Sequence, residues 1–157
     1  MTSLLASGSW VGTHGIRSIR AVMEELVQQA RQRILLSVYS LNEGAGTLFD
    51  RLGEAAARGV RIQVIADRAG VGDWGLDLLN RLSSSHPGAV EIHWFEGGDG
   101  SSLHAKVLAV DATHAIVGSA NFTHRGLVRS QELGVLLDGE PARNAFLVIQ
   151  DLFTQGE

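Results

Sequence analysis

The stretch LHAKVLAVDATHAIVGSANFTHRGLVRSQE, residues 103–132, combines a strand pattern with a set of reactive side chains. Its first part, 103–110, is rich in apolar residues and predicts a β-strand. Because side chains two residues apart leave the same face of a strand, His104 and Lys106 are expected to point to one spot. A second predicted strand, 114–118, returns and leads directly into a Gly-Ser-Ala-Asn segment.

The reactive residues follow a fixed spacing: His-x-Lys, four residues, Asp, six residues, Gly-Ser-x-Asn, and a later carboxylate. They are His104, Lys106, Asp111, Gly118, Ser119, Asn121 and Glu132. Attack on a phosphodiester needs a nucleophile, groups that hold the non-bridging oxygens and an acid for the leaving oxygen. An imidazole can be that nucleophile when a carboxylate holds its other nitrogen, and ammonium, amide and hydroxyl groups supply donors to phosphoryl oxygens. Lys106 is the only lysine among 13 cationic residues, so composition alone does not explain it.

This stretch resembles the HKD motif of the phospholipase D superfamily, whose pattern His-x-Lys-x4-Asp-x6-Gly-Ser-x-Asn is met at these positions. The superfamily's downstream glutamate is matched by Glu132, whereas Ser130 stands where an asparagine is often found. The N-terminal two thirds also resemble the layout of one repeat, with a strand ending in Asp67. The resemblance implies an α/β, phospholipase D-like fold: a mixed central β-sheet flanked by helices on both faces, with one HKD repeat in a single domain over 1–157.

The superfamily reaction implied by this resemblance uses two HKD motifs. One histidine attacks phosphorus and forms a phosphohistidine, while the other protonates the leaving alcohol. Since this chain has one motif, we expect a homodimer in which two His104 side chains meet across a two-fold axis. His104 would be nucleophile or general acid and Glu132 would orient it, while Lys106, Ser119 and Asn121 hold phosphate oxygens.

Asp111 belongs to the same motif and completes a catalytic set with His104, Lys106 and Glu132. Its position in the strand, five residues after Lys106, points its side chain away from the His104–Lys106 face. We therefore interpret Asp111 as a residue that orients the turn and the motif's backbone, not as the proton donor.

The net charge of −4 gives the chain no overall attraction to nucleic acid or anionic lipid. A phosphate polymer would therefore depend on local basic groups. Candidates for nucleic-acid contact are His124, Arg125 and Arg129 beside the motif, and Arg17 and Arg20 near the N-terminus; the alternative is that they are solvated surface residues. We expect no cofactor and no metal, because no two of the remaining histidines have the spacing of a zinc-binding helix.

Hydrophobic periodicity and turn residues predict the remaining elements. Helices are expected over 15–33, with Thr13 as N-cap, and over 47–58, 74–82 and 141–153. Strands are expected over 34–39, 60–66, 90–95 and 132–137. The first two of these strands are joined by a helix and should be parallel.

Two polar, glycine-containing loops lie at predicted strand ends. The loop 67–73 either borders the substrate or is a plain connector, and the flexible loop 96–102 would suit a gate. His93 shares a strand face with Glu91, so we expect it to face solvent.

Small one-motif members that resemble this chain are mostly nucleases, so the leading hypothesis is a metal-independent DNA or RNA phosphodiesterase. An alternative is a nucleic-acid-binding or structural subunit of a larger defence or restriction complex. A phospholipase or phosphatidyltransferase is a third hypothesis, which no basic amphipathic stretch supports. No apolar window approaches the roughly 18 residues of a membrane span, and the N-terminus lacks a basic region, so we expect a cytoplasmic protein.

Overall fold

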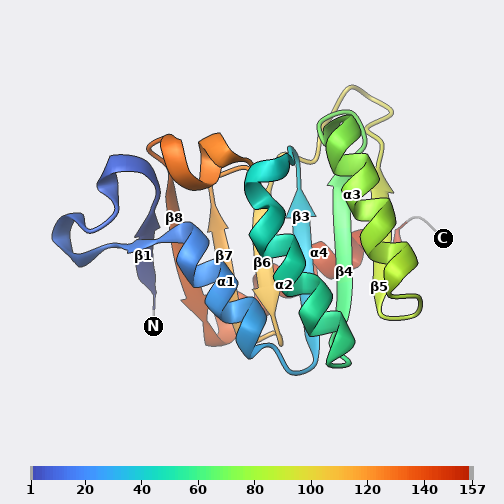
Figure 1. Ribbon diagram of the computed structural model, residues 1–157, viewed down its shortest axis with the longest axis horizontal. Helices are drawn as coiled ribbons and strands as arrows, with labels where there is room; N and C mark the ends of the chain where they lie inside the picture. The colour runs from blue at the N-terminus through green and yellow to red at the C-terminus, as the bar shows by residue number, and fades with distance from the viewer. Residues whose placement is uncertain (1, 156–157) are drawn as a thin grey trace.

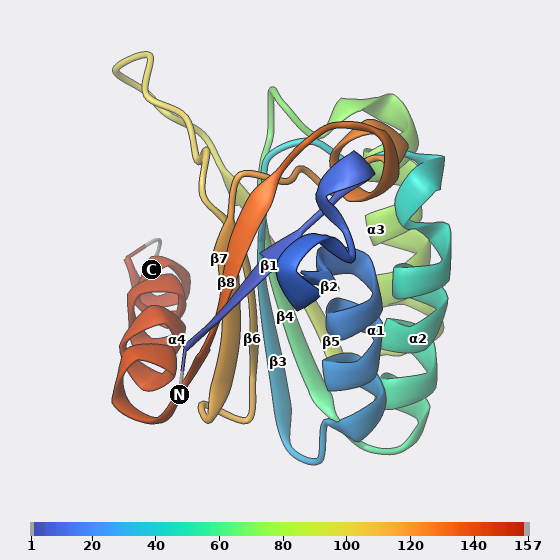
Figure 2. The same cartoon turned by 90° about the vertical axis from the view of Figure 1, so that its left-hand side faces the viewer.

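The computed structural model describes residues 2–155, which form an eight-stranded mixed sheet between two layers of helices. The strands are β1 (Ser3–Ala6), β2 (Arg17–Ser18), β3 (Arg33–Val38), β4 (Arg61–Asp67), β5 (Val90–Phe95), β6 (Lys106–Val110), β7 (His114–Gly118) and β8 (Leu133–Asp138). The helices are α1 (Ile19–Gln29), α2 (Gly46–Ala57), α3 (Gly72–Ser85) and α4 (Gly139–Thr154). Figures 1 and 2 show α1, α2 and α3 on one face of the sheet and α4 on the other. The predicted fold class is confirmed.

The strand order is β2-β1-β8-β7-β6-β3-β4-β5. The strands β3, β4 and β5 are parallel, as predicted for the first pair, whereas β6 is antiparallel to both β3 and β7. In the centre of the sheet, Leu36 of β3 pairs with Val64 on one side and Leu108 on the other. Each of these residues is fully buried, and burying such a side chain contributes about 1.5–3 kcal/mol. This core fixes β6, and with it the start of the reactive stretch, in the middle of the sheet.

Helix α1 begins later than its sequence pattern suggests. Residues 19, 22, 23, 26 and 27 form its buried stripe. The N-cap is Ser18, whose hydroxyl accepts a hydrogen bond from the backbone N–H of Ala21 at 3.2 Å, so the predicted cap at Thr13 is wrong. Thr13 instead begins a short 3-10 turn, and Arg17–Ser18 forms a strand parallel to β1.

The two N-terminal strands, β1 and β2, were not predicted. The strand β1 has four residues, of which only two are buried, so its hydrophobic pattern is weak. It is formed because it pairs antiparallel with β8, far along the chain. Helix α3 is also longer than predicted, and β6 begins only at Lys106, which leaves His104 just before the strand.

Asp111 lies in the tight turn between β6 and β7, where it and Ala112 have positive φ angles of 53° and 54°. Its carboxylate accepts hydrogen bonds from the backbone N–H groups of Arg31, Gln32 and Arg33 at 2.8–2.9 Å. These bonds tie the turn to the start of β3, in agreement with the interpretation that Asp111 orients the backbone. Asp111 follows the last residue of β6, at the opposite end of this strand from Lys106.

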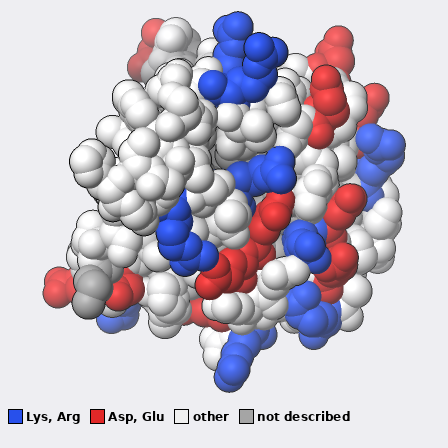
Figure 3. Space-filling view, turned by 60° about the vertical axis from the view of Figure 1, so that its left-hand side comes forward, with Lys and Arg blue, Asp and Glu red and all other residues white. Residues whose placement is uncertain are grey.

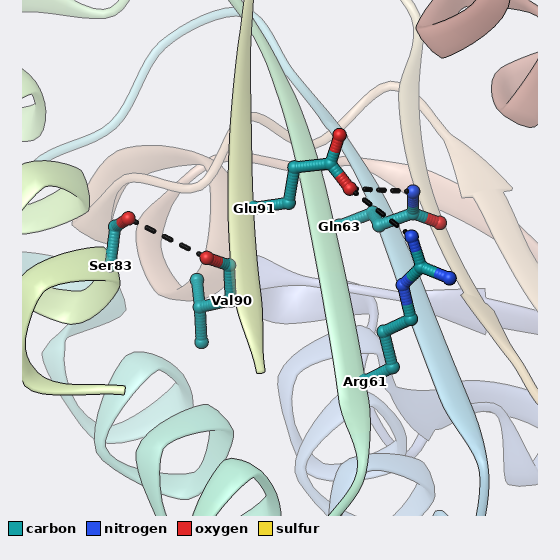
Figure 4. Close-up of polar contacts among 5 residues, drawn as sticks. All are labelled: Arg61, Gln63, Ser83, Val90 and Glu91. Carbon is teal, nitrogen blue, oxygen red and sulfur yellow. Dashed lines mark hydrogen bonds and ion pairs between the residues drawn. The ribbon is translucent and has the colours of Figure 1, made fainter. Parts of the chain in front are cut away.

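The edge strand β5 is fixed by polar contacts (Figure 4). The side-chain amide of Gln63 donates to Glu91 Oε2 at 3.0 Å, and Arg61 pairs with the same oxygen at 3.4 Å. From the other side of the sheet, the hydroxyl of Ser83 on α3 donates to the carbonyl of Val90 at 3.5 Å. The charged pair also makes this edge a poor template for pairing with another strand.

The expectation that His93 faces solvent is wrong. Its ring is only partly exposed and lies 5.3 Å, centroid to centroid, from the ring of Phe153 near the end of α4. His93 and Glu91 do lie on the same face of β5, but α4, a helix far along the chain, partly covers this face at His93.

No helix within the part of the chain described by the structure is long and apolar enough to cross a membrane.

Replacing Asp111 with Asn tests its hold on the backbone, because Asn tolerates positive φ but offers one acceptor oxygen in place of two. We expect Asp111→Asn to lower the free energy of unfolding by about 1–3 kcal/mol, measured by urea denaturation. Asp77→Asn, at an exposed position of α3, should stay within about 0.5 kcal/mol of wild type. Equal stability of the two variants would contradict this role.

Candidate active site

The reactive residues come from neighbouring strand ends on one edge of the sheet, at the top of Figure 1. Lys106, the first residue of β6, pairs with Gly118 at the end of β7, and Gly118 pairs with Gly134 near the start of β8. The two segments that carry Ser119 and Glu132 therefore leave the sheet beside Lys106. The same edge holds the carboxyl ends of β3 and β4, because β3 is antiparallel to β6 and parallel to β4.

Lys106 and His104 face one another, as the sequence predicts. The Nζ atom of Lys106 lies 2.8 Å from Nδ1 and 3.2 Å from Nε2 of the imidazole, and it donates to the carbonyl of His104 at 2.7 Å. Lys106 is 5% exposed, whereas His104 is exposed and open to a substrate. Burial lowers the pKa of Lys106, and the negative charge of Glu132 opposes that shift.

Tyr39, just after β3, forms the other side of this pair. Its ring centroid lies 4.5 Å from that of His104 with the planes tilted by 55°, and 5.4 Å from Lys106 Nζ. An aromatic face at this distance attracts the ammonium and restricts the rotation of the imidazole. Sequence reasoning missed Tyr39. Its place at the carboxyl end of a buried parallel strand is the signal that would have identified it.

The chain on either side of His104 is held by β3 and β4. The buried hydroxyl of Ser37 donates to the carbonyl of Ala105 at 2.8 Å. The carboxylate of Asp67, which is 4% exposed, accepts the N–H of Leu103 at 2.8 Å. These two bonds fix the backbone of His104 although that residue lies outside the β ladder.

Asp67 also shapes the surroundings of Tyr39. Its other oxygen accepts the N–H groups of Ala69 and Gly70, at 3.1 and 2.8 Å. Gly70 lies so close to Tyr39 that a Cβ atom there would come within 2.6 Å of the ring. Asp67 is therefore a positioning residue for both Tyr39 and His104, which sequence reasoning recognised only as the end of a strand.

Ser119 and Glu132 are joined by a short hydrogen bond from the Ser119 hydroxyl to Glu132 Oε2. The backbone N–H of Ser119 donates to the carbonyl of Leu133 at 3.0 Å. Among the described residues Glu132 makes no hydrogen bond to His104, so the expected orienting contact is not formed in this isolated chain. The carboxylate instead acts on the site through its charge on Lys106.

The backbone around Glu132 is clamped by Ser7, a fully buried residue at the end of β1. Ser7 donates through its N–H to the carbonyl of Glu132 at 3.0 Å and accepts from the N–H of Glu132 at 3.2 Å. Its hydroxyl also donates to the carbonyl of Ser130 at 2.6 Å. The position at which Ser130 departs from the superfamily pattern is thus held through its backbone.

Asn121 is held by its neighbours while its side chain stays uncommitted. A Cβ atom at Gly126 would come within 2.4 Å of the Asn121 carbonyl, so this turn packs tightly against the Asn121 backbone. Asn42 adds two bonds, accepting the N–H of His124 at 3.0 Å and donating to the carbonyl of Phe122 at 3.1 Å. Asn121 Oδ1 is buried and has no hydrogen-bond partner in the described part of the chain. An amide oxygen in this state can accept a hydrogen bond from a ligand that brings a donor, and the N–H groups of the same amide can donate to one that brings an acceptor.

The basic candidates fall into two groups. Arg125 and Arg129 lie exposed on a π-helical turn, Arg125–Arg129, and form no ion pair with any described residue. Arg17 and Arg20 instead pair with Glu25 and Glu24 of α1. Figure 3 shows basic and acidic groups interspersed on this side of the molecule, with no patch of one sign. Among these candidates, the positive charge left without an ion pair therefore lies on the segment beside Asn121.

Over residues 2–155, no group of three or more His, Asp or Glu side chains is placed to hold a metal ion.

Comparison with known proteins places the chain beside proteins of the same kind. The family model described as "Cardiolipin synthase, PLD-like domain" matches residues 23–153. A relative from Bacillus paralicheniformis, described as "DISARM protein DrmC", is 33% identical over 126 residues, which are 80% of this chain and 52% of the relative. Phospholipase D Z of Dictyostelium discoideum is 32% identical over 95 residues, 60% of this chain and 22% of that protein. The chain thus spans about half or less of the length of these relatives.

Two solved structures share the fold over nearly their full length. Nuc from Salmonella typhimurium, described as a phospholipase D family member, has a TM-score of 0.75 at 23% identity, covering 99% of this chain and 96% of its own. NucT from Helicobacter pylori has a TM-score of 0.78 at 16% identity, covering 98% and 96%. These likenesses show the fold, and the family model, which matches most of the chain, shows that the chain belongs to the phospholipase D superfamily.

Proposed function

We propose that this protein is a metal-independent phosphodiesterase that cleaves DNA or RNA through a phosphohistidine intermediate, with an active site formed by two HKD motifs across a homodimer. The observation that carries the proposal is the pairing of an exposed imidazole, His104, with a buried ammonium, Lys106 Nζ, 2.8 Å away. The choice of nucleic acid rests on the resemblance to small one-motif members of the superfamily and on the unpaired Arg125 and Arg129.

In the first step, one His104 attacks phosphorus and an N–P bond forms. The bond from phosphorus to the leaving oxygen breaks, and that oxygen takes a proton from the imidazolium of the partner's His104. In the second step, the partner's now neutral His104 removes a proton from water, the water oxygen attacks phosphorus and the N–P bond breaks. Each imidazole returns to its starting protonation state, so the cycle closes without a metal.

The remaining motif residues would stabilise the charge on the phosphoryl oxygens. Lys106 offers a fixed ammonium whose position is set by the His104 carbonyl, and Asn121 would donate through its side-chain N–H groups. Preorganised donors of this kind typically contribute a hundredfold or more to the rate. Ser119 would turn from Glu132 toward the phosphate, which would release the Glu132 carboxylate to stabilise the imidazolium.

Hydrolysis of bis(p-nitrophenyl) phosphate in excess EDTA tests the metal-independent histidine chemistry. Wild type should keep its activity, and His104→Asn should lose at least about a thousandfold, because no other group replaces the nucleophile. His114→Asn, an exposed histidine at the opposite end of β7 from the site, is the matched control and should behave as wild type. Activity that EDTA abolishes and Mg²⁺ restores would contradict the proposal.

Subunit mixing tests the shared site. If both histidines of a dimer serve one reaction, a mixed dimer of wild type and His104→Asn has no complete site. After dissociation and reassociation of an equal mixture, activity per wild-type chain should fall by about half, so that total activity is about a quarter of the all-wild-type value. Wild type taken through the same treatment alone is the control. Activity that stays proportional to the wild-type fraction would rule out a site built by two subunits.

A second candidate function is favoured by one comparison. The relative described as a DISARM protein is about twice as long as the aligned segment, since the chain covers 52% of it. A role as a nucleic-acid-binding or structural subunit of a larger defence complex would make turnover depend on a partner. Turnover by the purified chain, removed by His104→Asn, favours the enzyme over this alternative.

A further inference from the structure

We propose that the cavity between Tyr39 and the loop 96–102 binds the nucleobase next to the scissile phosphate. This inference rests on the proposed function and names a substrate subsite within it. The cavity has a volume of about 450 Å³ and is lined by Tyr39, Asp67, Arg68, Phe95 and the glycine- and serine-rich loop. A volume of this size lies within the range of pockets that bind small organic groups.

Tyr39 is the wall that the cavity shares with the catalytic pair. The centroid of the Tyr39 ring lies 4.5 Å from that of the His104 ring. Tyr39 also lines the cavity. A phosphodiester placed for attack by His104 has two ester substituents, and the cavity is a recess within reach of one of them. The group that enters it is therefore the nucleoside on one side of the phosphate.

The lining suits a flat, aromatic ligand. Tyr39 and Phe95 present half-buried rings, and Ala69 is the only aliphatic side chain in the wall. Arg68 adds an exposed planar guanidinium, which lies 5.2 Å from the centroid of the Trp94 ring. Stacking on aromatic and guanidinium planes strengthens binding by roughly tenfold or more per base and tolerates every base, because each has a π-face. A fatty acyl chain would find little aliphatic surface here.

Two acidic residues line the cavity, the buried Asp67 and the exposed Glu96, and the Asp67 carboxylate is already hydrogen-bonded. Both oxygens of Asp67 accept backbone N–H groups, from Ala69, Gly70 and Leu103. These bonds offset its charge and hold it against the floor of the cavity. The charged groups left to meet a ligand are the Arg68 guanidinium and the Glu96 carboxylate, so the cavity combines aromatic faces with one group of each sign, which suits an uncharged base.

The outer wall is a defined turn. Gly97 lies so close to Ser101 that a Cβ atom at 97 would be 1.8 Å from the Ser101 carbonyl oxygen. The N–H of Gly100 donates to the carbonyl of Gly97 at 3.1 Å, and the N–H of Ser101 donates to Asp99 at 3.0 Å. Figure 2 shows this yellow segment extending beyond the strand ends on the side of α4. A base inside a duplex would have to leave its stack to enter beneath such a wall, so single strands should be preferred.

Abasic scanning of a single-stranded oligonucleotide tests the subsite. In a series of end-labelled strands that each lack one base, wild type should cleave the phosphate beside the missing base at least about tenfold more slowly than the same phosphate in the intact strand. The double variant Phe95→Leu/Arg68→Ala keeps apolar volume but removes one ring and the guanidinium, and it should lose this discrimination. Arg143→Ala, an exposed arginine on α4, is the control and should keep it.

The outcomes separate the subsite from the proposed function. Cleavage that ignores the missing base in wild type overturns the subsite and leaves the nuclease intact. Absence of hydrolysis of both oligonucleotides and bis(p-nitrophenyl) phosphate overturns the proposed function and the subsite together. A larger loss by the double variant on phospholipid vesicles than on oligonucleotides would assign the cavity to a lipid and also overturn the proposal.

Discussion

The buried ammonium of Lys106 is the constraint on which the rest of the site depends. Removing a cation from water is costly, and Lys106 Nζ meets that cost with the carbonyl and imidazole of His104, the ring of Tyr39 and the charge of Glu132. This arrangement requires β6 to lie in the middle of the sheet with its first residue at the edge. Gly118 pairs with Lys106 and allows β7 to lie close to the start of β8. A Cβ atom at this position would come within 2.6 Å of the Leu133 carbonyl oxygen.

Around this centre, hydrogen bonds between buried or partly buried side chains and backbone groups hold the site segments in place. Asp67 and Ser37 fix the chain on either side of His104, Ser7 clamps Glu132, and Asn42 holds the turn after Asn121. Asp111 performs the same task at the far end of β6. The groups that would meet substrate are thus carried on a frame whose own polar contacts are already complete. Such a frame keeps reacting groups in place without reorganisation during the reaction.

The sequence predicts the parts of this site that follow local patterns. The spacing of His104, Lys106, Ser119, Asn121 and Glu132 identifies the motif, and alternation places His104 and Lys106 on one side, as the structure confirms. The parts that it misses depend on contacts between distant segments. Ser7 lies 125 residues from Glu132, Asn42 lies 82 from His124, and Asp67 lies 36 from Leu103, so no local pattern reports them. The misplaced His93 has the same origin, because α4 covers part of a face that β5 alone would leave open.

The central claim is that phosphorus is bound covalently to His104 during the reaction. The most direct test is the stereochemical course at phosphorus, measured by ³¹P NMR on the product of a chiral phosphorothioate dinucleotide cleaved in ¹⁸O-labelled water with EDTA present. Two successive in-line displacements predict net retention of configuration. Net inversion would show a single direct attack by water and would contradict the account.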